Sequence, residues 1–308
     1  MIGDVESLLN AALRVSTPLL FATLGEIYTE KSGVINLGLE GIMAMGALTA
    51  FSTTLLTGNI ILGVIAATIT GGAMGFIHAF MSIALRANQI VSGLAITMLG
   101  LGISELIGRI HYTGVPLPLR LQVIPIPYLS NIPVVGPLLF NHDPLTYLSL
   151  VLALTMWFIL FKTKAGIIIR AVGENPFAAD AIGINVYIVR YLCTVVGGML
   201  TGLGGAYLSV VYRPAFQPGM TAGLGWIAVA LTIFALWSPL RAIFGAALFG
   251  GLRALEFRLQ PLGIPPNIVA TLPYLFTIIV LTIGTRGMMR RIVEAPSSLG
   301  VPYVRGEK

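Results

Sequence analysis

The chain has 308 residues, of which 56% are hydrophobic and only 10% are charged, and its formal net charge is +6. A soluble domain carries about 25% charged residues, so this composition excludes an ordinary soluble enzyme and indicates that lipid is the main solvent. The basic residues fall between and after apolar runs, as orientation in a membrane requires, so we expect no nucleic-acid partner.

The first part of the chain contains four apolar segments long enough to approach the roughly 20 residues that cross a hydrocarbon core. They lie near 7–28, 38–57, 60–85 and 88–110. Residues 112–142 follow, with six of the eighteen prolines and a single basic residue, Arg120. Because proline interrupts helices, we expect an irregular extracellular platform here. A further crossing hidden in this segment would reverse the side of the N-terminus, which therefore stays open.

A span is expected at 143–161, and a basic segment, 162–190, follows it. Four more apolar stretches come next, near 191–211, 224–237, 240–256 and 267–284. The tail after residue 285 is again basic, and positive charge favours the cytoplasmic side. Four crossings return the chain to the side where they began, so the charge pattern and the count agree.

The sequence therefore predicts an all-α fold, a polytopic transmembrane helical bundle of about 8–10 spans without the alternation of a membrane barrel. We expect one domain with two related halves. Its parts are a first half 1–161, a cytoplasmic loop 162–190, a second half 191–285 and a basic cytoplasmic tail 286–308.

Two segments place glycines and polar residues directly before a short apolar run, GVINLGLEGIMAMGA (33–47) and FQPGMTAGLGWIAVA (216–230). Such discontinuous helices, in corresponding places of two halves, indicate a solute pathway. Asn36 and Glu40 in the first are candidate path residues, since an ionisable group at membrane depth is a functional candidate by default. The alternative is that Glu40 caps a half-helix, where negative charge is favoured.

The next span opens with four polar residues, which we also take as candidates for the translocation path. They are Asn88, Gln89, Ser92 and Thr97. The alternative is that they form hydrogen bonds between packed helices.

Other residues are interpreted as structural. Glu105 and Arg109 are four residues apart and should neutralise each other on a helix, and His78 and Cys193 should be packed. Small-xxx-small spacing lets helices approach closely, and it occurs at Gly71 with Gly75 and at Gly198 with Gly202.

Several kinds of catalytic motif are missing from the sequence. It contains no G-x-x-x-x-G-K-[ST] phosphate loop, no H-E-x-x-H or cysteine cluster and no G-x-S-x-G elbow. We therefore expect no catalytic residues, no metal site and no cofactor bound by this chain.

A short polar helix is predicted between two hydrophobic blocks, in AVGENPFAADAIGINV (171–186). Asn175 can cap it, Pro176 suits its first turn and Gly183 can end it. A helix of two turns is not stable alone, so we expect it to dock on another protein. The alternative, an amphipathic linker on the lipid headgroups, suits its acidic residues Glu174 and Asp180 poorly.

Three stretches resemble one family. AVGENPFAADAIGI resembles the coupling helix of permease subunits in the branched-chain amino acid, ribose and nucleoside group of bacterial ABC importers, which have a type II permease fold. GVINLGLEGIMAMGA resembles the signature after the first span of this group, and ANQIVSGLAITMLGLGIS resembles its nucleoside subgroup in particular.

The resemblance implies roles for matching positions. Asn36, Gly38, Glu40 and Gly41 match the first-half signature near the translocation path. The segment that would couple to the ATPase comprises Gly173, Glu174, Asn175, Pro176, Ala178, Ala179, Gly183 and Ile184.

The resemblance also implies partners and a location in the bacterial inner membrane. An ATP-binding subunit would use ATP and Mg²⁺, a second permease would complete the pathway, and an extracellular substrate-binding lipoprotein would dock on 112–142. The scarcity of unpaired charge in the expected path favours a neutral polar small molecule. The resemblance to the nucleoside subgroup favours nucleosides over a sugar or a branched-chain amino acid.

Two other classes remain as alternatives. A buried Glu40 and broken helices would also suit an ion-coupled secondary transporter. A membrane scaffold that moves no solute would leave both interruptions unexplained.

Overall fold

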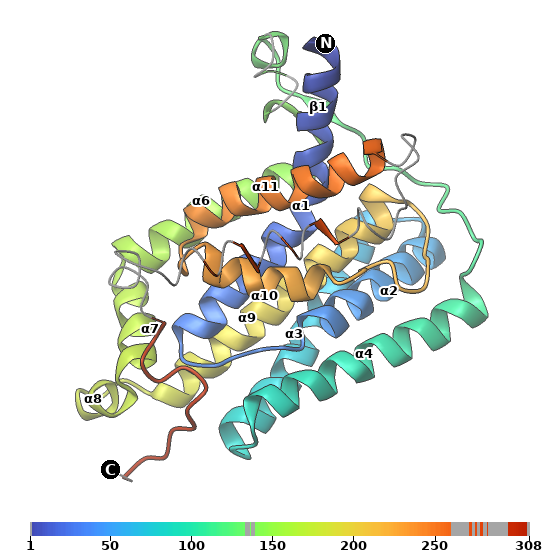
Figure 1. Ribbon diagram of the computed structural model, residues 1–308. Helices are drawn as coiled ribbons and strands as arrows, with labels where there is room; N and C mark the ends of the chain where they lie inside the picture. Colours follow the sequence, from blue (N-terminus) through green and yellow to red (C-terminus); the bar gives the residue numbers. More distant parts are fainter. Residues whose placement is uncertain are drawn as a thin grey trace.

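The computed structural model describes residues 2–132, 136, 139–259, 271–272, 275, 278–279, 282 and 295–306 (Figure 1). The helices are α1 (Ile2–Lys31), α2 (Leu39–Thr57), α3 (Ile60–Ala79), α4 (Gln89–His111), α6 (Pro144–Lys162), α7 (Lys164–Glu174), α8 (Pro176–Ala181), α9 (Val186–Ala206), α10 (Leu224–Phe234) and α11 (Pro239–Leu259). Wider π-helical turns extend α3 over Phe80–Ala84 and α9 over Tyr207–Tyr212. The helical fold expected from the sequence is confirmed.

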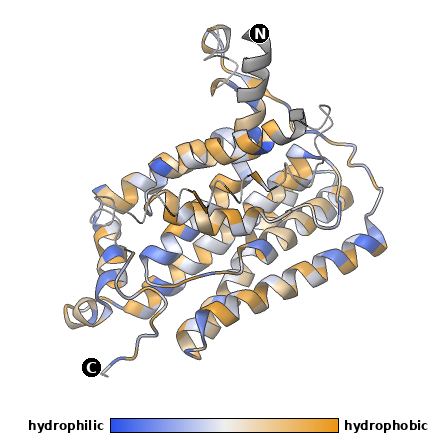
Figure 2. Ribbon diagram, viewed as in Figure 1, coloured by the Kyte–Doolittle hydropathy of each residue, from blue (hydrophilic) through white to orange (hydrophobic). Residues whose placement is uncertain are grey.

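Five helical segments among the described residues are long and apolar enough to cross a membrane. They are α2, α3 with its extension, α4, α6 and α9 with its extension. Their outer surfaces are apolar, as lipid contact requires: Met98 and Ile110 of α4 are largely exposed. In Figure 2 α4 is mostly hydrophobic along its length, with hydrophilic residues near its ends.

Glycines allow the central helices to touch backbone to backbone. Gly198 and Gly202 of α9 face Gly71 and Gly75 of α3, and Gly25 of α1 lies against Gly197. A side chain at any of these positions would overlap the opposite backbone. The small-xxx-small spacing therefore marks real helix contacts, because only glycine permits this approach.

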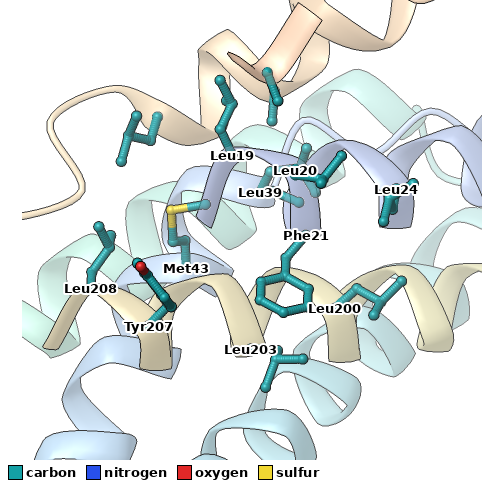
Figure 3. Close-up of a cluster of buried hydrophobic side chains, with 14 of the residues drawn as sticks. Leu19, Leu20, Phe21, Leu24, Leu39, Met43, Leu200, Leu203, Tyr207 and Leu208 are labelled. Carbon is teal, nitrogen blue, oxygen red and sulfur yellow. The ribbon is translucent and has the colours of Figure 1, made fainter. Parts of the chain in front are cut away.

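The hydrophobic core gathers around α1. Leu20, Phe21 and Leu24 of α1 pack with Met43 of α2 and Leu203 of α9, all of them buried (Figure 3). Alpha helices from both halves of the chain thus share one core.

The proline-rich segment 112–142 is irregular, as predicted. Its described residues form a short 3₁₀ turn, Leu129–Asn131, and a two-stranded antiparallel ribbon, β1 (Ile124–Pro125) with β2 (Asn141–His142). Pro116 pairs with Ala215, beyond the end of α9.

The segment 162–190 contains more helix than the sequence indicated. The short helix is confirmed as α8, but α7 precedes it and α9 already begins at Val186. The helix α7 escaped prediction because KAGIIIRAVGE combines glycines with three consecutive isoleucines, which are weak helix formers.

The two ends of the bundle carry different segments. The start of α1 lies near β1, whereas α7, α8 and the last described residues lie at the other end (Figure 1). Lys31, the last residue of α1, contacts Gly173 of α7. The N-terminus is therefore at the same end as the proline-rich segment. The expected span 267–284 and tail residues 286–294 lie almost entirely outside the described residues.

The glycine contacts predict a sharp positional effect. Gly202→Leu should destabilise the protein by about 1–3 kcal/mol or more, because its Cβ would overlap the Ala67 carbonyl oxygen and force α3 from α9. Unfolding in detergent can be followed through maleimide labelling of Cys193, the single cysteine, which is buried.

Gly102 of α4 is the matched control, because nothing lies within 4 Å of a Cβ built there. In Gly102→Leu, Cys193 should become labelled at the same temperature as in the wild type. If both leucine variants unfolded at the same temperature, the packing argument would be contradicted.

Candidate functional site

The first interruption, residues 32–38, is a stretch of non-helical backbone enclosed by protein. Asn36 Oδ1 accepts from the Gly38 N–H (2.9 Å), and the Asn36 N–H donates to Glu26 Oε1 (3.0 Å). From α4, Gln89 accepts the Ile35 N–H (2.8 Å) and Thr97 donates to the Leu37 carbonyl (2.8 Å). Irregular backbone at membrane depth requires such satisfaction.

Glu40 joins the two interruptions. Its carboxylate is buried and accepts hydrogen bonds from Thr221 Oγ1 (2.6 Å), the Gly223 N–H (2.9 Å) and the Gly225 N–H (2.7 Å). Both oxygens thus lie at the N-terminus of α10, where the helix dipole favours negative charge. The structure shows Glu40 as a cap, and the helix it caps belongs to the other half of the chain; its role in the translocation path stays a prediction.

The remaining path candidates separate into two kinds. Ser92 is buried and contacts His78 Nδ1 (3.1 Å), whose Nε2 meets the Ile35 carbonyl (2.8 Å). Asn88 is exposed, and its side chain caps α4 by accepting from Ile90 and Val91. The structure therefore brings Asn36, Gln89, Ser92 and Thr97 together around the interruption, whereas Asn88 lies at the helix end.

Two buried amide nitrogens at this place are unpartnered. Within the described part of the chain, Asn36 Nδ2 and Gln89 Nε2 have no hydrogen-bond partner. Gln89 also lines a pocket of about 320 Å³ together with Arg86 and Asn88. These are donors that a polar solute or water could engage.

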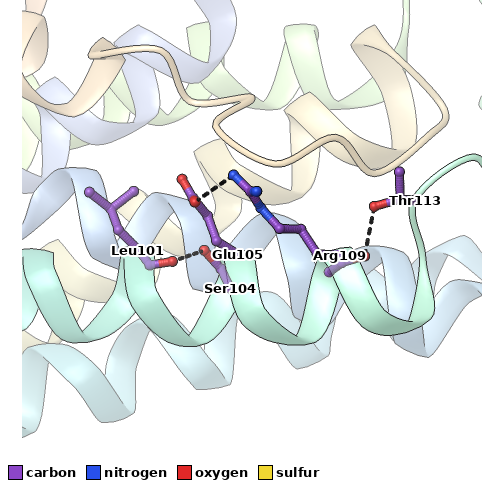
Figure 4. A network of polar contacts seen from close by, with 6 residues as sticks. Leu101, Ser104, Glu105, Arg109 and Thr113 are labelled. Atoms are coloured by element: carbon purple, nitrogen blue, oxygen red, sulfur yellow. Dashed lines mark hydrogen bonds and ion pairs between the residues drawn. The ribbon is translucent and has the colours of Figure 1, made fainter.

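Sequence reasoning missed two buried carboxyl groups of α1. Glu26 holds the interruption through Asn36, and Glu30 accepts from the indole N–H of Trp237, just beyond α10. Acidic residues four apart at the end of the first apolar segment, in GEIYTEK, were a signal for a buried polar contact. Glu105 and Arg109 form the expected pair at 3.3 Å (Figure 4).

The helix α8 has the termini that the sequence predicted. Asn175 Oδ1 accepts from the Ala178 N–H (3.0 Å), Pro176 occupies the first turn, and Gly183 adopts φ +88°. The Ile184 N–H returns to the Ala179 carbonyl (3.0 Å), which closes the helix. A left-handed residue at this place is what a glycine cap provides.

The eight expected coupling residues point in different directions. Gly173, Pro176 and Ala179 are buried, and Ile184 is partly buried. Glu174, Asn175, Ala178 and Gly183 are exposed, but Glu174 accepts from the Ser297 hydroxyl (2.8 Å). The largest outward apolar side chains are Phe177, 46% exposed, and Ile182, 77% exposed. Sequence reasoning did not single these two out.

A basic pocket lies at the opposite end of the bundle. Its volume is about 470 Å³, and Arg14 of α1, Arg120 of the proline-rich segment and Arg213 after α9 line it. Three guanidinium groups around one opening favour an anionic partner.

The capping of α10 predicts how Glu40 variants behave. Glu40→Ala should lower the free energy of unfolding by at least about 2 kcal/mol, because it leaves buried donors without an acceptor. Glu40→Gln should cost less, since one acceptor oxygen remains. Cys193 labelling without added solute measures this.

Glu105→Gln is the control, because it removes an exposed pair worth only about 0.3–0.5 kcal/mol. If Glu40→Ala unfolded at the same temperature as Glu105→Gln, the cap would not be stabilising.

Comparison with known proteins identifies the family. Residues 8–281 match the family described as branched-chain amino acid transport system / permease component. No solved structure matches.

Three curated relatives match over nearly their full lengths. A putative glucose ABC transporter permease protein of Haloferax volcanii is 39% identical, covering 97% of each chain. The guanosine ABC transporter permease protein NupQ of Bacillus subtilis is 38% identical over 97% of this chain and 96% of its own. The nucleoside ABC transporter permease protein NupC of Lactococcus lactis is 32% identical over 100% and 99%.

These matches confirm the resemblance read from the coupling and first-half stretches. Relatives of this kind are transport components of the membrane, which work with an ATP-binding subunit and a substrate-binding protein. The chain belongs to the family of branched-chain amino acid transport system permease components, and it is the transmembrane permease subunit of an ABC importer.

Proposed function

We propose that this permease translocates a neutral polar solute, with nucleosides as the first candidate class, and that ATP hydrolysed by a partner subunit drives the transport. Relatives named for guanosine and for nucleosides support this substrate class. The relative named for glucose makes a sugar the second candidate.

The groups around the first interruption favour an uncharged solute. Glu40 is fully engaged in the cap of α10, so it does not offer a negative charge to a passing molecule. The amide nitrogens of Asn36 and Gln89 are hydrogen-bond donors. Such donors suit the carbonyl and hydroxyl oxygens of nucleosides and sugars. The same occupancy of Glu40 counts against an ion-coupled transporter that would protonate it.

The observation that carries the coupling mechanism is the outward apolar face of α8. Phe177 and Ile182 stand exposed at the end of the bundle that carries the basic segment 162–190. With this end in the cytoplasm, the ATP-binding subunit would cover them and exclude water. Closure of the ATP-binding subunits would then displace α8 and shift the bundle between outward-open and inward-open states.

The remaining partners follow from the same orientation. A second permease subunit would complete the pathway, and this chain would bind no nucleotide itself. The substrate-binding protein would dock at the outer end, over residues 112–142 and the basic pocket of Arg14, Arg120 and Arg213.

Uptake into proteoliposomes tests the substrate class. We expect the assembled importer to accumulate labelled guanosine with ATP and binding protein present, and unlabelled nucleosides to compete better than glucose. Better competition by glucose would move the assignment to sugars. Uptake that needs an ion gradient and not ATP would reject the mechanism.

The exposed face of α8 predicts an uncoupling variant. Phe177→Glu with Ile182→Glu should reduce association with the ATP-binding subunit at least about tenfold, because two charges would be buried against an apolar partner. Co-purification in mild detergent and solute uptake measure this. Phe177→Leu with Ile182→Val keeps the surface apolar and should retain both; assembly that is unaffected by the glutamates would rule out this face as the docking site.

The basic pocket predicts a weaker interaction with the binding protein. Arg120→Gln should lower its affinity about two- to tenfold, and the effect should shrink at high salt, because exposed charges are screened. Surface-immobilised binding protein and permease in nanodiscs give the measurement. Arg109→Gln, at the same end but paired with Glu105, is the matched control and should leave affinity unchanged; equal losses would contradict a specific role of the pocket.

A further inference from the structure

The last described residues, 295–306, form a strap along the α7–α8 end of the bundle. In Figure 1 this dark red segment passes beside α7 and α8 before the C-terminus. It has no regular secondary structure, yet it contacts the ends of several helices. We call residues 295–306 the strap.

The strap is first joined to the end of α7. The Ser298 N–H and hydroxyl both donate to the Gly173 carbonyl, at 3.0 and 2.7 Å, and Ser297 donates to Glu174. The Gly173 carbonyl is one of the last in α7, and such carbonyls have no hydrogen-bond partner within their own helix. The strap therefore completes the C-terminus of α7 directly before α8 begins.

Arg190 joins the strap to the bundle. This side chain of α9 is 2% exposed, and its guanidinium donates to the Ser32 carbonyl (3.2 Å), the Ser298 hydroxyl (3.2 Å) and the Val301 carbonyl (3.0 Å). A buried guanidinium is tolerated only when its donors are satisfied. The end of α1, the first turns of α9 and the strap are therefore held by one side chain.

The strap also reaches the first interruption. The Gly300 N–H donates to the Gly33 carbonyl (3.2 Å), and Ile35 packs close to Gly300. Residues 33 and 35 belong to the non-helical stretch that Gln89 and His78 hold from α4 and α3.

The buried face of α8 packs against the strap as well as against α7 and α9. Tyr303 is 4% exposed and packs with Val172, Ala179 and Val186, and its ring meets those of Phe177 and Tyr187 at centroid distances of 5.2 and 5.4 Å. Arg305 Nε lies 3.0 Å from Asp180 Oδ2. A helix of six residues cannot hold its position alone, so the strap, together with α7 and α9, fixes α8.

We infer that the strap is a positioning element of energy coupling, which holds α8 and carries its displacement to α1, α9 and the first interruption. This inference rests on the proposed docking of α8 against the ATP-binding subunit. Phe177 has one part of its ring on Tyr303 and another part exposed, so a push on the exposed part is passed directly to the strap. Gly300 and Arg190 then pass it to the segment around Asn36.

Hydrogen exchange of the intact importer tests whether the strap holds α8, independently of ATP hydrolysis by the ATP-binding subunit. In Arg305→Ala the amides of residues 177–182 should exchange about two- to fivefold faster, as expected for an exposed ion pair, while those of α3 stay unchanged. In Tyr303→Ala the increase should be larger, and Tyr303→Phe, which retains the ring, should resemble the wild type.

Transport assays test the coupling part with the same variants. Tyr303→Ala and Arg305→Ala should retain the ATP-binding subunit but transport less solute per ATP hydrolysed, with Tyr303→Ala the more affected. Arg109→Ala, which removes an exposed ion pair at the other end, is the matched control and should couple normally.

The outcomes separate the strap from the proposed docking. Unchanged amide exchange of residues 177–182 in both variants, or normal solute transport per ATP in Tyr303→Ala, would overturn the role of the strap even if the Phe177 and Ile182 glutamates abolish assembly. Faster exchange and poor coupling in the strap variants, with assembly intact after those glutamates, would keep the strap and reject the docking face. If Tyr303→Ala fails to assemble, Arg305→Ala decides, because its side chain is exposed and its loss does not threaten folding.

Discussion

A single buried carboxylate joins the two interrupted segments of this protein. Glu40, in the first turn of α2, accepts hydrogen bonds from Thr221 and from the backbone at Gly223 and Gly225 at the start of α10. A charge in this environment is costly unless its hydrogen bonds are complete. The backbone donors at a helix start also lack partners of their own. The Glu40 carboxylate and the backbone donors at the start of α10 therefore satisfy each other. Neither half of the chain could form its broken helix in the same way alone.

The surrounding packing follows from this junction. Gly41 of α2 lies against Thr97 and Gly100 of α4, and Gly225 of α10 lies against the backbone at Glu40. Only glycine allows these approaches. The first interruption is then enclosed by α1 and α4, whose side chains Glu26, Gln89 and Thr97 replace the hydrogen bonds that a continuous helix would have made. Close backbone contact and polar compensation together make a non-helical segment tolerable within a membrane.

The two ends of the bundle are suited to different partners. At one end the irregular proline-rich segment and three arginines surround an open pocket. At the other end Phe177 of α8 and Ile182, the residue directly after it, expose apolar side chains, while the inner face of α8 packs on Tyr303 of the strap. The end with the arginines suits a charged soluble partner. The end with Phe177 and Ile182 suits a partner that covers these apolar side chains. The first interruption begins at this second end, where Arg190 and Gly300 join it to the strap, and runs from there into the bundle.

The sequence by itself determined the helical membrane fold, the positions of most spans, both interruptions and the caps of α8, because hydrophobic runs and capping residues act locally. The family also followed from local motifs. Tertiary structure alone decided that Glu40 caps the helix of the other half, that Ala179 faces inward while Phe177 and Ile182 face outward, and that Ser298 and Arg190 fasten the terminus to α7. These contacts join residues more than 100 positions apart, and their partners depend on how the helices pack, which no local pattern encodes.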